Sequence, residues 1–316
     1  MSRRVSYFPK SVFLVIILTF LLSNITKLEA QPISFGEFQT NSKIVYRLSG
    51  IYNGNKTFEF VSIETIDGRT CILVRVKLDL RIQFGTTSVR IEYTSEFCYD
   101  ERGRPVRERM KVPLEANSSI EEVIVEYWWG ERCFPDKVKM YFHLKGNVTE
   151  IYELDMIHGS GIFLSGDERS EFSFTQNNLS EILPFVPEAL ITPYIDFSSI
   201  KFKKGVEKTF GEGSRRIKLK VLGLEYVDTP AGTFDCYKVL LEGIDEYGIP
   251  YNSTLYITKG KPRFTVMYET YSIGIKQRGW VVYLYLPKRF PTRLVIMVGT
   301  ILALSALILI ALRRRA

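Results

Sequence analysis

Few side chains of this sequence are of the types that carry out catalysis or bind metals. It has only two histidines, His143 and His158, and a lone histidine is far more often a surface residue than a general base or a ligand. No His-Glu-x-x-His, Gly-x-Ser-x-Gly or P-loop motif occurs, and residues 211–214 lack the spacing of a phosphate loop. We therefore expect no catalytic residue, no cofactor and no metal site.

Carboxylates are the remaining candidates for acid–base chemistry. Glu121, Glu122 and Glu126 lie just before Trp128 and Trp129. Two carboxylates up to about 10 Å apart in a cleft, beside rings that stack on sugars, would indicate a glycan-processing enzyme. A chain with 35 acidic residues contains many such groupings, and solvated strands explain this one better. We predict a non-enzymatic protein and keep the enzyme as a less favoured hypothesis.

The four cysteines, Cys71, Cys98, Cys133 and Cys236, could form two disulfide bonds in an exported protein. The strands expected between them place Cys71, Cys98 and Cys133 at the same end of a sheet. We favour the pair Cys98 and Cys133 because both adjoin polar turns, and this bond would contribute roughly 3 to 4 kcal/mol. Cys71 and Cys236 would then pair or remain buried thiols. The strand register also allows Cys71 to lie opposite Cys98.

Asparagine usage indicates export. Five of the eight asparagines between residues 31 and 293 begin an Asn-x-Ser/Thr sequon, where about one is expected by chance. The alternative is that they are turn-forming residues beside Ser and Thr. The candidate N-glycosylation sites are Asn55, Asn117, Asn147, Asn178 and Asn252.

The first 30 residues have the layout of a signal peptide. A basic start is followed by an apolar run over residues 12–22 and by Ala30 before Gln31. Eleven residues span roughly 16 Å as a helix, which is about half of a bilayer core. We therefore predict cleavage of residues 1–30 rather than a permanent anchor.

The other end of the chain has the composition of a membrane anchor. Residues 294–312 are 19 consecutive uncharged positions, about the length of a spanning helix. Residues 287–293 would form a linker, and residues 313–316, three arginines and Ala316, a cytoplasmic tail. The apolar segment could instead be a sorting signal, although no Leu-Pro-x-Thr-Gly motif precedes it.

The excess positive charge lies at these two ends. The formal net charge is +7, but residues 1–30 and 293–316 contain eight of the 42 basic residues and only one of the 35 acidic ones. The remaining 34 basic and 34 acidic residues balance, so the domain between has no field that would attract phosphates. We expect no nucleic-acid binding, and a cell-membrane protein with an extracytoplasmic domain.

Apolar and polar residues alternate over most of residues 31–286, which predicts a mainly β, antiparallel domain. The period is two from residue 42 to about 155, and strands resume after residue 217. Residues 157–199 contain Gly159, Gly161, Gly166 and three prolines, so we expect an irregular crossover there that could cover a cavity mouth. Turn residues predict chain reversals at 53–55, 67–68, 84–86, 101–105, 130–136 and 146–147.

One hairpin resembles a known family. The run Thr229-Pro230-Ala231-Gly232-Thr233-Phe234, preceded by residues 202–205, is similar to uncharacterised envelope proteins related to the LolA/LolB lipoprotein carriers. The resemblance covers residues 200–271. It implies a strongly curved antiparallel sheet or half-barrel, whose concave face holds acyl chains in LolA-like proteins, and it implies no catalytic residues. The C-terminal anchor and the chain length depart from those carriers.

Two functions are compatible with these features. The first is a membrane-anchored surface protein whose half-barrel cavity binds a lipid or another apolar ligand. The second is an envelope interaction or structural protein that acts through a protein partner. A solvent-open cavity, or a face without sequons, would separate the two. The high share of Ile, Val, Tyr, Lys, Arg and Glu also indicates a thermophilic prokaryote, and Asn-linked glycosylation would then point to an archaeal-like source.

Overall fold

The computed structural model describes residues 37–50, 52–84, 87–101, 103–113, 120–131, 134–146, 148–175, 195, 197–211, 216–244, 250–272 and 275–287. They include 16 strands and the short 3-10 helix η3 (Phe197–Ser199). All the strands belong to one compact unit that ends at Tyr285. The strands are β1 (Lys43–Ser49), β2 (Tyr52–Ile66), β3 (Arg69–Phe84), β4 (Thr87–Asp100), β5 (Pro105–Pro113), β6 (Ile120–Trp128), β7 (Lys137–Leu144), β8 (Val148–Asp155), β9 (Ser160–Ser165), β10 (Glu168–Ser173), β11 (Glu207–Phe210), β12 (Ile217–Thr229), β13 (Gly232–Ile244), β14 (Pro250–Thr258), β15 (Thr265–Ser272) and β16 (Ile275–Tyr285).

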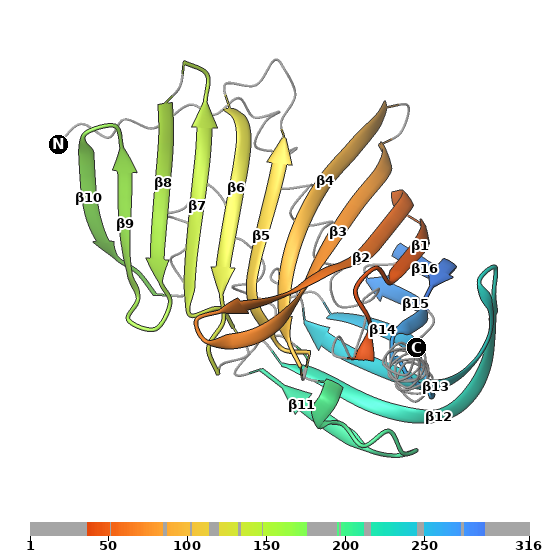
Figure 1. Ribbon diagram of the computed structural model, residues 1–316. Helices are drawn as coiled ribbons and strands as arrows, with labels where there is room; N and C mark the ends of the chain where they lie inside the picture. The colour runs from red at the N-terminus through yellow and green to blue at the C-terminus, as the bar shows by residue number, and fades with distance from the viewer. Residues whose placement is uncertain are drawn as a thin grey trace, which may run out of the picture. The chain divides into compact units, whose positions relative to one another are not determined.

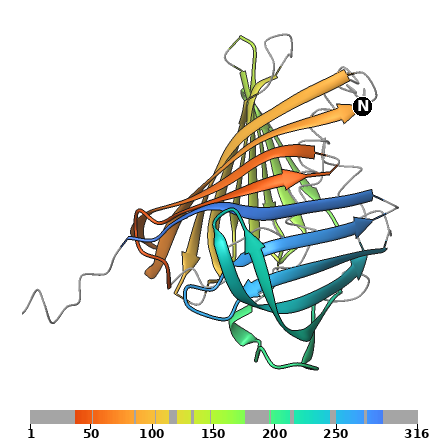
Figure 2. The same ribbon diagram turned by 90° about the vertical axis from the view of Figure 1, so that its right-hand side faces the viewer.

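The described strands form a single 16-stranded antiparallel sheet in the order β10 to β1, then β16 to β11 (Figure 1). Neighbours in the sheet are neighbours in sequence, except where β1 pairs with β16 from Lys43 opposite Tyr285 to Ser49 opposite Arg278. Two meanders therefore meet at this seam, and β10 and β11 are the two edges. The sheet is strongly curved and does not close (Figures 1 and 2). The mainly β, antiparallel architecture that we predicted is confirmed.

Alternation gives the sheet two different faces, because directly opposed residues of neighbouring strands place their side chains on the same side. Ile44, Phe58 and Val76 lie opposite one another in β1, β2 and β3 and are buried in the main core. We call this side the inner face. The residues next to these along each strand point to the opposite side, which we call the outer face. It carries charged residues such as Lys43 and Glu59, which lie opposite each other.

The hairpin between β12 and β13 has the geometry that its turn residues predict. Thr229 pairs with Gly232, and Pro230 and Ala231 form the turn. The N–H of Ala231 donates to Thr229 Oγ1 over 3.2 Å, and the Thr229 hydroxyl donates to the Gly232 carbonyl over 3.1 Å. Gly232 has a φ of 132°, which favours glycine at this position.

Gly54 lies inside β2, so the turn that we expected at residues 53–55 was wrong. The strand continues through these residues, and Gly54 faces Leu80 of β3. A Cβ on Gly54 would lie 2.0 Å from the carbonyl oxygen of Asp79. Glycine at this position allows the two strands to approach closely rather than to reverse.

Part of the segment 157–199 is also more regular than expected. β9 and β10 form a hairpin in it, so an irregular connection was wrong for these residues. Gly159 and Gly166, with φ values of 64° and 56°, occupy the turns on either side of β9. Gly161 lies within β9 under the Phe172 ring, where a Cβ would lie 2.4 Å from Phe172 Cζ. Residues 176–194 lie outside the described part.

The predicted targeting segments also lie outside the described residues. This holds for residues 1–30, for the tail 313–316 and for the apolar segment 294–312, and only Pro287 of the linker 287–293 is described. No helix in the described ranges is long and apolar enough to cross a membrane. The signal peptide and the anchor remain predictions.

Candidate functional site

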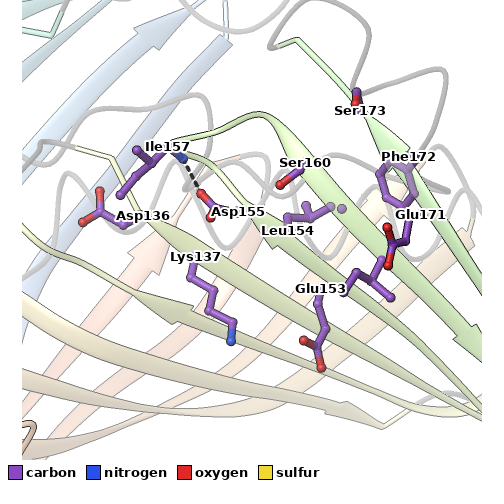
Figure 3. A pocket seen from close by; sticks show the side chains of 12 residues that line it. Asp136, Lys137, Glu153, Leu154, Asp155, Ile157, Ser160, Glu171, Phe172 and Ser173 are labelled. Atoms are coloured by element: carbon purple, nitrogen blue, oxygen red, sulfur yellow. Dashed lines mark hydrogen bonds between the residues drawn. The ribbon is translucent and has the colours of Figure 1, made fainter.

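A hollow of about 690 Å³ lies at the ends of β7, β8, β9 and β10 (Figure 3). Because Lys137 lies opposite Asp155, which lies opposite Ser160, these three side chains share the outer face. Leu154 and Phe172, which also line the hollow, belong to the inner face. Carboxylates predominate among the charged lining residues, which are Asp136, Lys137, Glu153, Asp155 and Glu171.

Two carboxylates of the hollow are held as anions. Glu153 forms an ion pair with Lys139, and Asp155 Oδ2 lies 2.8 Å from His158 Nδ1. The hydrogen bond from Lys139 lowers the pKa of Glu153, and the hydrogen bond from His158 lowers the pKa of Asp155. A general acid of a glycosidase needs a raised pKa, so these two groups do not support a glycan-processing enzyme.

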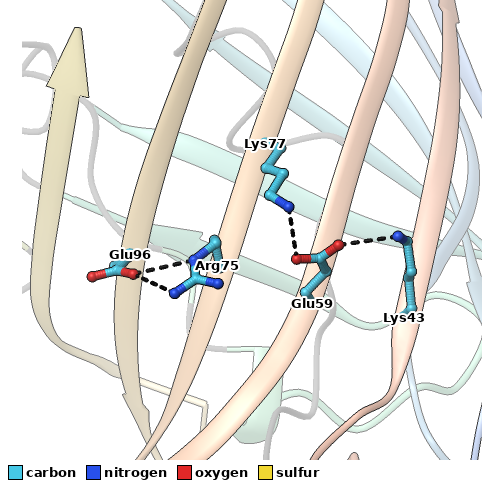
Figure 4. A network of polar contacts seen from close by, with 5 residues as sticks. All are labelled: Lys43, Glu59, Arg75, Lys77 and Glu96. Carbon is cyan, nitrogen blue, oxygen red and sulfur yellow. Dashed lines mark hydrogen bonds and ion pairs between the residues drawn. The ribbon is translucent and has the colours of Figure 1, made fainter.

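Charged side chains on the outer face of β1 to β4 are paired in the same way (Figure 4). Glu59 lies 3.0 Å from Lys43 and 3.1 Å from Lys77, and Arg75 donates two hydrogen bonds to Glu96. Burial alone would raise the pKa of Glu59, but the hydrogen bonds from both lysines outweigh it, so this pKa is lowered. Exposed pairs of this kind contribute about 0 to 1 kcal/mol each.

Two of the three carboxylates that we considered from the sequence belong to this outer network. Glu126 lies 2.9 Å from Arg107 and Glu122 lies 2.6 Å from Lys111. Glu121 is exposed where the register between β6 and β7 shifts. Glu122 and Glu126 thus each pair with a cation of β5.

His143, Trp128 and Trp129 contact neighbouring side chains of the sheet. His143 Nδ1 lies 3.2 Å from the Thr149 hydroxyl. The Trp128 ring has the charged groups of Arg107 and Lys137 5.7 and 5.6 Å from its centre, and Trp129 packs against the core. Nowhere in the described residues do three or more His, Cys, Asp or Glu side chains gather as metal ligands would.

Two of the five candidate glycosylation sites can be placed. Asn55 lies on the outer face, where its side-chain oxygen accepts a hydrogen bond from Arg47. Asn252 is exposed, and its neighbour Ser253 points to the inner face. Both described sequons are thus on the outer face, and Asn117, Asn147 and Asn178 lie outside the described residues.

The structure brings two of the four cysteines together. Cys71 and Cys98 are buried in the same small cluster, whereas Cys236 is buried in the main core. The structure shows no disulfide bond at these three cysteines. Cys133 lies outside the described residues, so the pair Cys98 and Cys133 stays a prediction.

The side chains of the inner face become more exposed from β7 to β9. Met140 and Phe142 of β7 are fully buried, but Tyr152, which faces Met140 from β8, and Phe163, which faces Tyr152 from β9, are half-buried. The ring centres of Phe142 and Tyr152 are 5.7 Å apart, and those of Tyr152 and Phe163 are 4.8 Å apart. The core therefore continues as a partly open aromatic surface, which we call the aromatic wall.

Glu150 is a carboxylate at the end of this wall. It lies opposite Phe142 of β7 and Ser165 of β9, and it has no hydrogen bond or ion pair with any residue that the structure describes. Burial raises its pKa. Burial, and then the charge of Glu150, also raise the pKa of Tyr152 to about 12.

The sequence did not point to this wall. The residues Val-Thr-Glu-Ile-Tyr-Glu-Leu-Asp of β8 place polar and apolar side chains on both faces, so their alternation carries no signal. Only the register shows that Glu150 shares a face with Phe142. An amphipathic lining, with many apolar groups and few polar ones, is typical of ligand sites.

No protein-family model matches the sequence, and no curated protein matches it. Among solved structures, it is similar to a β-barrel-like protein of a domain of unknown function, DUF1849, from Brucella abortus, at 12% identity and a TM-score of 0.36, over 79% of this chain and 99% of that one. A candidate exported protein with a YmcC-like fold from Bacteroides fragilis has 9% identity and a TM-score of 0.29, over 81% and 100% of the two chains. A candidate lipoprotein from Parabacteroides distasonis has 11% identity and a TM-score of 0.29, also over 81% and 100%. At such TM-scores these proteins establish no function for this chain, and the likeness to LolA and LolB stays a prediction.

Proposed function

We propose that this chain is a non-enzymatic protein, anchored in the cell membrane with its β domain outside, that binds a lipid or another apolar ligand on the aromatic wall. The observation that carries the proposal is the partly open surface of Tyr152 and Phe163, which ends at Glu150, a desolvated carboxylate with no ion pair or hydrogen bond to the residues that the structure describes. Covering apolar area gains about 25 cal/mol per Å². An apolar chain against the rings, with a polar group near Glu150, would fit this surface.

The outer face differs from the aromatic wall, and this difference supports the proposal that the ligand binds on the inner face. Its carboxylates are paired with cations, as Glu59 and Glu126 show. The two described sequons, at Asn55 and Asn252, are also on this face. If they carry glycans, the inner face is left free for a ligand. The predicted signal peptide and anchor support the placement at a membrane, where lipids are at hand.

Photo-crosslinking of the full chain in its membrane tests the proposal. Phe163→p-benzoylphenylalanine places a photoreactive ring on the aromatic wall. Leu164→p-benzoylphenylalanine is the matched control, because Leu164 is the next residue of β9, is also half-buried and points to the outer face. We expect irradiation to attach acyl chains, detected by mass spectrometry, at position 163 and not at position 164. Equal labelling at both positions, or none at 163, would contradict ligand binding on the wall.

A protein partner on the outer face is the second candidate function. The hollow at the ends of β7 to β10 favours it, because it is concave and adjoins the sheet edge formed by β10. The same experiment separates the two functions. Crosslinks from position 164 to another protein, without lipid at position 163, would favour the partner.

A further inference from the structure

In the described part of the chain, the outer face contains an apolar island beside its ion pairs. Cys71, Cys98 and Val106 are 1%, 4% and 5% exposed and form a cluster separate from the main core. Ile66 and Leu73 pack against them. The island lies at one end of the hairpin of β3 and β4, on the face where Arg75 and Glu96 form an ion pair.

The strand register places the two thiols diagonally across this hairpin. Cys71 faces Asp100, and Leu73 faces Cys98, so all four side chains share the outer face. Diagonal neighbours in a sheet are about 7 to 8 Å apart between Cα atoms and closer between side chains. The Cys71 and Cys98 side chains pack in the same buried cluster.

A β-bulge beside Cys98 gives the backbone room to adjust. The register between β4 and β5 shifts after Cys98, since Cys98 faces Arg107 but Tyr99 faces Pro105. The extra residue, Val106, packs on the two thiols. A bulge increases the local twist of a strand, and such an adjustment of the backbone would bring the two Cα atoms toward the usual spacing of a disulfide, about 4.4 to 6.8 Å.

We propose that Cys71 and Cys98 form a disulfide bond that joins β3 to β4 in the mature protein. This inference rests on the extracytoplasmic placement in the proposed function, because disulfides persist in oxidising compartments. It does not depend on a ligand, since the island is on the opposite face from the aromatic wall.

The bond forms by thiol–disulfide exchange with the disulfide of an envelope thiol oxidant. The thiolate of one cysteine attacks that disulfide, which gives a mixed disulfide and releases one thiolate of the oxidant. The second cysteine thiolate then attacks the mixed disulfide, forms the bond between Cys71 and Cys98 and releases the other thiolate. Two electrons and the two cysteine protons pass to the oxidant, which becomes a dithiol.

The thiol–disulfide exchange takes place during folding, before the two cysteines are buried. Burial raises the pKa of Cys71 and, more strongly, that of Cys98, so few thiolates exist once the island has formed. A hairpin of β3 and β4 not yet covered by Val106 would still expose both thiols to the oxidant.

Peptide mapping of the full chain tests the proposal. Free thiols are blocked with N-ethylmaleimide before digestion with trypsin without reductant. Trypsin would release the four cysteines in separate peptides, residues 70–75, 91–102, 133–137 and 221–238. We expect 70–75 linked to 91–102, and the same link in the Cys133→Ser variant. A link between 91–102 and 133–137, or blocked thiols in both 70–75 and 91–102, would overturn the proposal.

The N-terminal peptide in the same digest separates the two inferences. Free Cys71 and Cys98 in a chain that has lost residues 1–30 would overturn the disulfide alone. Free thiols with residues 1–30 still present would also count against export.

Thermal unfolding supplies a second readout. Cys71→Ala and Cys98→Ala should each lower Tm by on the order of 10 °C, and the double variant by nearly the same amount, because any one substitution removes the bond. Cys236→Ala, which changes another buried thiol, should add its own decrease to theirs. Additive effects of Cys71→Ala and Cys98→Ala would show two packed thiols without a bond.

Discussion

Glu59 and Glu150 are carboxylates of the same sheet, yet their surroundings are opposite. Glu59, on the outer face of β2, lies between Lys43 and Lys77 at 3.0 and 3.1 Å. Glu150, on the inner face of β8, lies opposite Phe142 and has no hydrogen bond or ion pair with the described residues. The pKa of Glu59 is lowered and that of Glu150 is raised.

The comparison shows that two carboxylates of one sheet can be accommodated differently, Glu59 beside cations and Glu150 without a cationic partner among the described residues. Asp79, Glu153 and Glu207, whose pKa values are also lowered, have cationic partners on neighbouring strands. By contrast, the pKa of Glu150 is raised by burial. A group kept at the cost of desolvation and without a partner is a candidate for ligand recognition.

The largest expected effect comes from truncating the inner face. Phe142→Ala should lower the free energy of unfolding by about 3 to 5 kcal/mol, because Phe142 is 1% exposed and its removal leaves a cavity. Tyr141→Ala, one residue away on the half-buried outer face, should cost less than about 1 kcal/mol. Denaturant unfolding of both variants measures the difference, and similar losses would mean that the two faces are not distinct.

Neutralising Glu59 and neutralising Glu150 should change the free energy of unfolding in opposite directions. Glu59→Gln should lower the free energy of unfolding at pH 7 by up to about 1 kcal/mol, since it weakens contacts to two partly exposed lysines. Glu150→Gln should leave it unchanged or raise it by up to about 1 kcal/mol, because a desolvated charge is removed. A clear loss of stability in Glu150→Gln would indicate a partner for Glu150.

Carboxyl groups with lowered and with raised pKa values should also make opposite contributions to the pH dependence of stability. The lowered pKa values of Glu59 and Glu153 give stability that is present above the unfolded pKa of about 4.3 and is lost as pH falls through the folded values. The raised pKa of Glu150 gives stability that is present below its unfolded pKa and is lost as pH rises through the folded one.

We therefore expect the wild-type chain to lose stability between about pH 6 and pH 3. Glu150→Gln should lose a few tenths of a kcal/mol more over that range, because it lacks the opposing contribution of Glu150. Unfolding midpoints across the range test this. Equal losses in the two chains would mean that Glu150 titrates as it does in the unfolded chain.

The smallest effect should come from single exposed cations. Lys77→Gln should cost a few tenths of a kcal/mol at low ionic strength and nothing measurable in about 0.5 M salt, because its ion pair with Glu59 is partly exposed. A salt-independent loss would indicate that the Lys77 stem, and not its charge, packs on the outer face.

Much of the strand pattern could be predicted from the sequence, because one face is apolar and the other charged. The alternation around Ile72 and Val138 predicts β3 and β7, and the Thr229 to Phe234 turn predicts the hairpin of β12 and β13. The prediction of turns and irregular segments fails at glycines that lie inside strands. Gly54 permits a close approach of two strands, and Gly161 lies under the Phe172 ring. Such contacts depend on partners that local composition does not reveal.

The candidate site could not be predicted for a related reason. Within β8, Glu150, Tyr152 and Leu154 share one face, but a strand with polar residues on both faces shows no alternation. Register with β7 decides that Glu150 stands beside Phe142, and register is a property of two strands. The meeting of Cys71 and Cys98, by contrast, was among the pairings that counting along β3 and β4 allowed.

The seam between β1 and β16 also has a consequence for how the protein is made. The Tyr46 hydroxyl donates to the carbonyl of Thr265, 219 residues further along the chain, over 2.7 Å. The two meanders can form from local hairpins, but this pairing is among the least local in the fold and should limit the folding rate. Until β16 arrives, β1 is an open edge, and Lys43 and Arg47 on it would discourage pairing with other chains. A cell that synthesises this protein must therefore keep a half-finished sheet from aggregating until its last strand reaches its first.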